Sequence, residues 1–184
     1  MSCSNIPPPG QPPDGREIPK PRYGRNQERR PAGGLPVRGR SRRLGVSIAY
    51  FDGRPEQVGS VRAWCTGATG LDEETAAPVV LALSELVSNA IQHTASGDRC
   101  GRVRVSVETM PGEVVLLGVT DDGPKAGQQI TRPHLTGHPE EPRVHGRGLH
   151  LVAALSEKWW WTGAWGGPLT MWALIDPHRA LGSG

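Results

Sequence analysis

The stretch Leu83-Ser-Glu-Leu-Val-Ser-Asn-Ala-Ile-Gln-His93 decides the fold, because it divides into an apolar and a polar face at helical spacing. The apolar face predicts a helix that packs against a core. Glu85 and Asn89 are four residues apart, so they are neighbours on the polar face. This spacing alone fits a solvated surface as well as a site. The apolar face comprises Val79, Leu83, Leu86, Val87 and Ala90, and the polar face comprises Glu85, Ser88, Asn89 and Gln92.

Two residues compete for the start of this helix, which runs to about Thr94. If Thr75 is the N-cap, Pro78 stands at the third helical position, where no backbone donor is needed. If Asp72 is the N-cap, Pro78 lies deeper in the helix and a kink is expected.

The segments on both sides of this helix alternate between strand and helix patterns. Strand 114–120 is nearly all apolar, which predicts a central strand covered on both faces. Pro111-Gly112 joins it to the preceding strand as an antiparallel hairpin. We expect an α+β two-layer sandwich, with a mixed, mostly antiparallel sheet and helices on one face. The other expected elements are strands at 46–51, 102–108, 158–162 and 169–175 and helices at 55–68 and 148–157.

The chain divides into a basic tail and a mildly acidic body. Residues 1–45 carry ten basic and three acidic residues, hence +7, which leaves 11 basic and 15 acidic residues, hence −4, for the rest. With few aliphatic residues, this tail is expected to be disordered. It is either a solubilising terminus, which we prefer, or a basic arm for nucleic acid. The expected organisation is a disordered tail at 1–45, a single domain at 46–176 and a C-terminal tail at 177–184.

Several classes of protein are excluded by composition and by missing motifs. Three cysteines without a CxxC pair exclude a disulfide scaffold and a cysteine zinc site, and free thiols fit a cytoplasmic protein. Neither a signal peptide nor a convincing membrane span is present. The chain has no GxxxxGK[ST] phosphate loop, no GxGxxG after a strand and no GxSxG elbow.

Three segments carry candidate chemistry when they are taken together. The first is the helix with Glu85 and Asn89. The second is Asp121-Asp122-Gly123-Pro124 at the end of a buried strand, where a carboxylate can accept a hydrogen bond from an exocyclic amine. The third is Gly146-Arg147-Gly148-Leu149, whose backbone donors at a helix start suit phosphate oxygens. The long loop 122–146 between the last two is typical of functional loops.

This ordered set resembles the GHKL superfamily, the ATP-binding domains of gyrase, histidine kinases and MutL with the Bergerat fold. It is most similar to the small domains related to anti-sigma-factor serine kinases. The resemblance spans about residues 46–176.

By this resemblance, ATP and Mg²⁺ are the cofactors. Glu85 is then the catalytic base and Asn89 the Mg²⁺ ligand, and Asp121 reads the adenine with support from Gly123. The phosphate site takes Gly146, Arg147, Gly148 and Leu149, while Thr170 supports the adenine site and residues 124–145 form the ATP lid. The sequence departs from the family at Lys125, where the first glycine box usually has its last glycine. This lysine restricts lid conformations or places a cation near the phosphates.

Two functions remain open at this stage. The first is a Mg²⁺- and ATP-dependent serine/threonine protein kinase. Its substrate would be an anti-sigma-factor antagonist, and the protein would also act as an anti-sigma factor that holds a sigma factor. The second is a catalytically silent module that binds ATP and regulates transcription by holding a protein partner. We leave a homodimer open and expect neither a membrane nor nucleic acid as partner.

Overall fold

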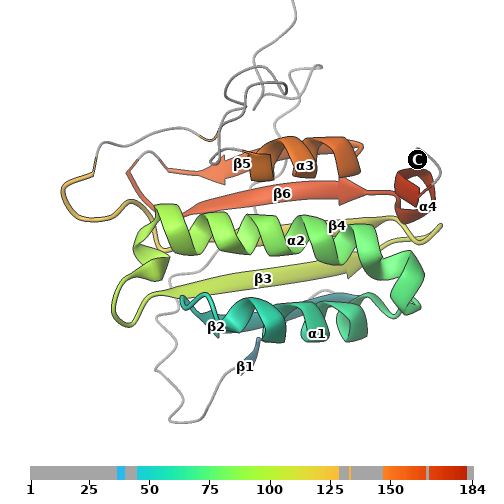
Figure 1. Cartoon of the computed structure of the whole chain (residues 1–184), viewed down its shortest axis with the longest axis horizontal. Coiled ribbons are helices and arrows are strands. Elements are labelled where there is room, and N and C mark those ends of the chain that lie inside the picture. The colour runs from blue at the N-terminus through green and yellow to red at the C-terminus, as the bar shows by residue number, and fades with distance from the viewer. Residues whose placement is uncertain (1–36, 40–44, 129–132, 134–146, 165, 182–184) are drawn as a thin grey trace, which may run out of the picture.

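The computed structural model describes residues 37–39, 45–128, 133, 147–164 and 166–181. Its six-stranded sheet has the strand order β1-β2-β3-β4-β6-β5 (Figure 1). All five pairings are antiparallel, so the mostly antiparallel sheet is confirmed, without a parallel pair among the described strands. The strands are β1 (Val37–Gly39), β2 (Val46–Asp52), β3 (Arg102–Thr109), β4 (Val115–Thr120), β5 (Lys158–Gly163) and β6 (Leu169–Ile175).

The helices cover one face of this sheet, which confirms the two-layer sandwich (Figure 1). Alternate strand residues point toward them, so that Val103, Val105 and Val107 of β3 are completely buried. Leu83, Leu86 and Val87 of the central helix pack onto the same core. The helices are α1 (Gln57–Thr69), α2 (Glu73–His93), α3 (Arg147–Leu155), α4 (Pro177–Leu181) and a short 3₁₀ turn, η1 (Ala95–Gly97).

No described helix lies on the second face of the sheet, so the expectation that strand β4 is covered on both faces needs correction. On this face Trp172 lies against Gly118, where an added Cβ atom would come within 2.6 Å of the indole ring. Trp160 stacks on Trp172 with ring centroids 6.3 Å apart. Side chains of the sheet itself therefore give β4 partial cover on that face.

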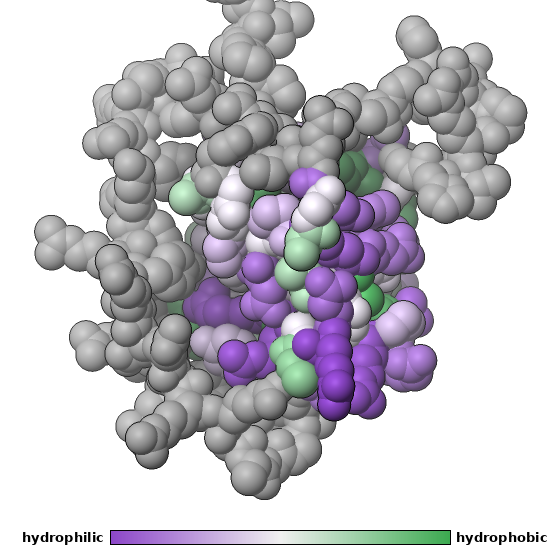
Figure 2. Space-filling model, turned by 90° about the vertical axis from the view of Figure 1, so that its left-hand side faces the viewer, coloured by the Kyte–Doolittle hydropathy of each residue, from purple (hydrophilic) through white to green (hydrophobic). Residues whose placement is uncertain are grey.

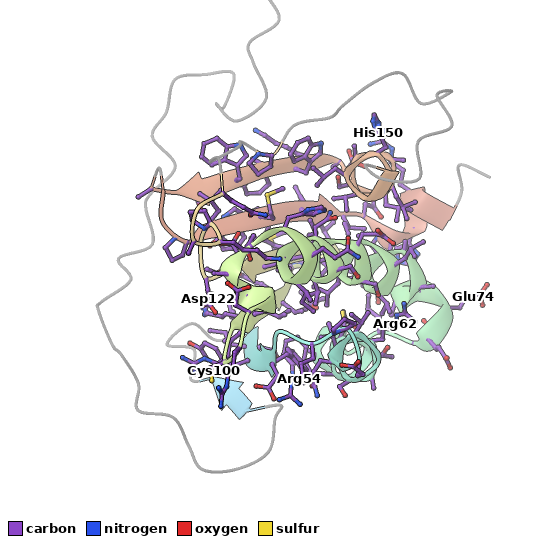
Figure 3. All side chains as sticks on the ribbon, turned by 60° about the vertical axis from the view of Figure 1, so that its left-hand side comes forward. Arg54, Arg62, Glu74, Cys100, Asp122 and His150 are labelled. Carbon is purple, nitrogen blue, oxygen red and sulfur yellow. The ribbon has the colours of Figure 1, made fainter. Side chains whose placement is uncertain are left out.

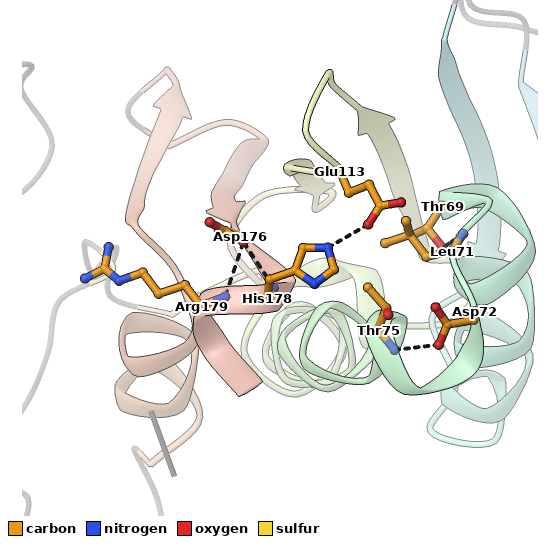
Figure 4. Close-up of polar contacts among 8 residues, drawn as sticks. All are labelled: Thr69, Leu71, Asp72, Thr75, Glu113, Asp176, His178 and Arg179. Carbon is orange, nitrogen blue, oxygen red and sulfur yellow. Dashed lines mark hydrogen bonds and ion pairs between the residues drawn. The ribbon is translucent and has the colours of Figure 1, made fainter. Parts of the chain in front are cut away.

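Helix α2 begins at the earlier of the two candidate caps. The Asp72 carboxylate accepts a hydrogen bond from the Thr75 amide at 3.0 Å (Figure 4). Pro78 consequently lies inside the second turn and is buried. Since proline has no amide hydrogen, the carbonyl of Glu74 has no donor from that position of the helix.

Two elements lie in segments that were predicted to be tails. Strand β1 lies inside the stretch 1–45 and pairs with β2. The expected disorder therefore does not hold for the three residues of β1. Helix α4 lies inside 177–184. Asp176, just before this helix, accepts hydrogen bonds from the amides of His178 and Arg179 (Figure 4). The His178 ring also contacts Glu113 at 2.6 Å, which ties α4 to the β3–β4 turn. None of the helices in the described ranges is long and apolar enough to cross a membrane.

Candidate functional site

Asp121, directly after β4, is held in a fixed orientation by backbone amides. Its Oδ1 atom accepts hydrogen bonds from Gly123 N at 2.7 Å and Leu169 N at 3.1 Å. The Asp121 amide in turn donates to the Leu169 carbonyl at 2.9 Å. Within the described residues no donor reaches the second oxygen, Oδ2. Asp121 therefore keeps one acceptor for a ligand while the other fixes its direction.

The same surroundings change the proton affinity of Asp121. Burial raises the pKa of this carboxyl, and the negative charge of Asp122 raises it further. The hydrogen bonds from Leu169 and Gly123 act in the opposite direction, because they stabilise the ionised form. The net shift of the pKa is upward, and shifts of this kind are common at functional sites.

The neighbouring acid, Asp122, has a structural role that the sequence pattern did not reveal. Its Oδ2 atom accepts a hydrogen bond from the Arg102 amide at 2.6 Å. Its own amide donates to the hydroxyl of Ser96 at 2.9 Å, and Ser96 is completely buried. Of two consecutive acids, Asp122 thus fastens the chain to η1 and β3, while Asp121 faces the site.

Gly123 is required by the backbone at this turn. Its φ angle of +89° lies in the left-handed region that favours glycine. An added Cβ atom would lie 3.1 Å from the carbonyl carbon of Gly167. The Gly123 carbonyl also accepts a hydrogen bond from Ala95 at 2.8 Å, which places this turn at the C-terminal end of α2. The resemblance gave Gly123 a supporting role beside Asp121, and the structure adds a backbone reason for the glycine.

Glu85, Asn89 and Gly148 come together where α3 starts beside α2. A Cβ atom added to Gly148 would lie 2.7 Å from Glu85 Oε2, 3.3 Å from Asn89 Nδ2 and 3.5 Å from Asn89 Oδ1. Both polar side chains are therefore turned toward the backbone of α3 rather than toward bulk solvent. Two segments that are far apart in sequence thus form one polar surface between two helices.

Of the other residues predicted at the start of α3, the structure describes Leu149 and the backbone of Arg147. Leu149 packs against the hydrophobic core, so it anchors the helix. Arg147 is the first residue of α3, and its side chain lies outside the described part. Gly146 and residues 129–132 and 134–145 of the predicted lid lie outside the described residues as well.

The structure places Thr170 on β6, beside Leu169, with its side chain on the face of the sheet opposite the helices. Met171 packs against the core under the helices, and Thr170 alternates with it onto the opposite face of β6. There its hydroxyl shares a hydrogen bond of 2.9 Å with the hydroxyl of Thr120. Leu169 takes the neighbouring position and binds Asp121 through its backbone. Leu169 and Thr170 are adjacent on β6, so their side chains lie on opposite faces of the sheet, because side chains alternate along a strand.

Lys125 reaches the end of α2 in this structure. Its Nζ atom donates a hydrogen bond of 2.9 Å to the carbonyl of Gln92, in the last turn of the helix. A cation at this position is favourable because the C-terminal end of a helix carries partial negative charge. Lys125 therefore ties the 121–125 turn to α2.

The candidate site follows the C-terminal half of α2, from Glu85 to the turn at Asp121. Asp122 lies at one end of the molecule, far from Glu74 at the start of α2 (Figure 3). The described residues on that end are mostly hydrophilic, with a few apolar ones between them (Figure 2). Asn89 offers an amide oxygen, a ligand type that Mg²⁺ accepts, and no group of three His, Cys, Asp or Glu suited to a metal lies in the described ranges.

Comparison with known proteins gives this geometry a family. The model of the histidine kinase-like ATPase domain matches residues 51–171. The chain belongs to this family. All described residues of the site lie within the matched range.

The chain is also similar to individual proteins. The chain is 29% identical over 115 residues to the serine-protein kinase RsbW of Oceanobacillus iheyensis, covering 56% of this chain and 70% of that protein. A solved structure with the RsbU and RsbW domains of a Mycobacterium tuberculosis protein has a TM-score of 0.50 at 20% identity, covering 70% of this chain and 32% of that one. The chain thus spans about a third of that structure's length, and the likeness concerns the fold. A histidine kinase domain from Erythrobacter litoralis gives a TM-score of 0.39 at 23% identity, covering 68% of this chain and 62% of that one.

Proposed function

We propose that this protein binds ATP with Mg²⁺ and transfers its γ-phosphoryl group to a serine or threonine hydroxyl of a protein partner. The observation that carries the proposal is the contact of Gly148 with both Glu85 and Asn89. A carboxylate and an amide oxygen there face a glycine backbone at a helix start, which is where phosphate oxygens bind well. Family membership and the RsbW relative support a kinase-like role.

The described residues fit a bound Mg·ATP at both ends. Asp121 Oδ2 would accept a hydrogen bond from the exocyclic amine of adenine, while Oδ1 stays bound to two amides. Gly148 has no side chain, so its backbone lies directly against the side chains of Glu85 and Asn89. Asn89 Oδ1 would hold Mg²⁺, whose remaining ligands would be phosphate oxygens and water.

In the proposed reaction, Glu85 accepts the proton of the acceptor hydroxyl. The hydroxyl oxygen forms a bond to the γ-phosphorus of ATP, the bond from that phosphorus to the β–γ bridging oxygen breaks, and ADP leaves. Catalysis of this kind depends mainly on positioning and charge neutralisation. Asn89 and the backbone at Gly148 would supply those contributions.

We propose an anti-sigma-factor antagonist as the acceptor protein, so that the chain regulates transcription in the cytoplasm and itself acts as an anti-sigma factor. The support for this choice is the resemblance of its motifs to anti-sigma-factor kinases and the RsbW relative.

The test is transfer of labelled γ-phosphate from ATP to proteins that co-purify with the full chain. Glu85→Gln should bind ATP like wild type, because the amide is nearly isosteric, but transfer should fall about 10²–10⁴-fold. Asn89→Ala should weaken Mg²⁺-dependent ATP binding in calorimetry. The matched control is Glu74→Gln on an exposed position at the other end of the same helix, which should change neither quantity.

The two substitutions must differ in their effects for the proposal to hold. If both variants bind ATP and transfer phosphate like wild type, Glu85 and Asn89 are solvated surface and the kinase assignment fails. Wild-type protein that binds ATP but transfers phosphate to no co-purified protein would favour the silent binding module instead.

A further inference from the structure

Two side chains near Glu85, one on the surface ridge of α2 and one on α1, are not used by the proposed ATP site. Leu81 is 44% exposed and is the one large hydrophobic residue with high exposure in the described part of the chain. It lies four residues before Glu85, so the two side chains are neighbours on the helix surface. Arg62 of α1 reaches the same ridge from the side and lies between α1 and α2 (Figure 3).

Arg62 is held in place by a buried anchor. Its Nε atom donates a hydrogen bond of 3.0 Å to the hydroxyl of Ser84, which is only 3% exposed. Ser84 itself donates to the Val80 carbonyl at 2.8 Å, so the orientation of its hydroxyl is fixed. Within the described residues the two Nη groups of Arg62 have no hydrogen-bond partner. They remain available as a planar fork of donors, which suits a carboxylate.

We infer that Arg62 and Leu81 form a docking surface for the protein segment that carries the acceptor hydroxyl. The occupant we propose is an extended segment with an aliphatic side chain that covers Leu81 and a carboxylate that binds Arg62. This inference rests on the proposed function and adds the chemistry of the partner to it.

The position of the ridge explains why an acceptor segment would pass over it. An acceptor hydroxyl has to come within about 3 Å of the Glu85 carboxylate to give up its proton. Side chains four residues apart on a helix are roughly 5–6 Å apart at Cβ, and an extended chain advances about 3.3 Å per residue. A residue about two positions from the acceptor would therefore lie over Leu81, within reach of Arg62.

The arginine distinguishes this ridge from ordinary surface. A single exposed leucine is common on soluble proteins and needs no explanation. Here the leucine lies three residues from Ser84, which holds the Nε atom of a guanidinium whose Nη donors have no partner among the described residues. Arginine is among the residue types that contribute most to the affinity of protein interfaces.

The test is selection from a library of short peptides with a fixed central serine and randomised flanking residues. The full chain is incubated with the library in the presence of Mg²⁺ and a non-hydrolysable ATP analogue, and bound peptides are sequenced. We expect enrichment of an aliphatic and an acidic residue near the serine. Leu81→Ser and Arg62→Glu should each weaken binding of enriched peptides about tenfold, whereas Arg54→Glu, an exposed arginine just before α1, should not.

Charge reversal gives the sharper measurement, because a variant that merely unfolds loses all binding. Arg62→Glu should bind peptides in which the acidic residue is replaced by lysine better than it binds the original peptides. Leu81→Met should keep wild-type affinity. The inference is overturned if no sequence is enriched, or if Arg62→Glu and Leu81→Ser bind the enriched peptides like wild type. Phosphorylation of the enriched peptides is measured separately, so a failure of transfer alone counts against the proposed function and leaves the docking surface standing.

Discussion

At the residue scale, Asp121 is proposed to bind adenine as a carboxylate, although its burial disfavours the ionised form. Its burial raises the pKa of the carboxyl, so ionised Asp121 makes the folded state less stable than an ordinary surface aspartate would. The stability associated with this raised pKa is fully present below the unfolded pKa and is lost as the pH rises through the folded pKa. A buried acid that is unfavourable for folding at neutral pH is better explained by ligand binding than by structure.

We predict that Asp121→Asn weakens ATP binding without lowering the melting temperature at neutral pH. The amide oxygen can still accept the hydrogen bonds from Gly123 and Leu169, so the turn is kept. Loss of a charged hydrogen bond to adenine should cost about 1.5–3 kcal/mol, which is roughly ten- to a hundredfold in Kd. Calorimetry and thermal melting measure the two effects. Wild-type affinity in this variant would remove Asp121 from the binding site.

At the element scale, the close contact between α2 and α3 depends on a glycine. We predict that Gly148→Ala reduces phosphate transfer while the stability stays the same or rises slightly. The new methyl group would displace the flexible end of Glu85 rather than backbone, and alanine favours helix over glycine by up to about 1 kcal/mol. Transfer assays and thermal melting compare this variant with wild type.

The control for this variant is Gly67→Ala on α1. An added Cβ atom at Gly67 meets nothing within 4 Å, so this substitution should leave transfer unchanged. Full activity in Gly148→Ala would mean that the position of the Glu85 carboxylate does not matter for the reaction.

The sequence predicted some helices and strands but not others. Periodicity identified α2 and the strands around it, because burial of one face leaves a regular pattern in the chain. It could not identify β1 or α4, which are too short to have a pattern. The choice of Asp72 over Thr75 as N-cap depends on local geometry, since both residue types are good caps.

Within the site, the resemblance named residues from three segments, and the structure adds which of their side chains lie together. Gly148 does contact Glu85 and Asn89, although the sequence gave no distance between them. The face of Thr170 could not be predicted from the motif, because a shift of one residue along a strand reverses the direction of a side chain. The structural role of Asp122 depends on Ser96 and Arg102, and no local pattern connects these residues to it.

At the scale of the whole molecule, the basic N-terminal segment supplies none of the residues of the candidate site. We predict that deletion of residues 1–36 leaves the melting temperature and ATP binding nearly unchanged, because no site residue lies in that segment. Deletion of residues 1–45 also removes β1 and exposes the edge of β2, so it should lower the melting temperature further. If removal of residues 1–36 alone lowers the melting temperature by many degrees, the prediction that the domain folds without this segment is wrong.

The central claim is that the site between α2, α3 and the Asp121 turn recognises ATP, and a calorimetric titration of the full chain with Mg·ATP and with Mg·GTP tests it most directly. Adenine presents an amine to the Asp121 carboxylate, whereas guanine presents a carbonyl oxygen at the same place. We predict saturable binding of ATP and an affinity for GTP that is lower by about tenfold or more, as expected when a charged acceptor loses its donor. No binding of ATP, or equal binding of the two nucleotides, would contradict the account.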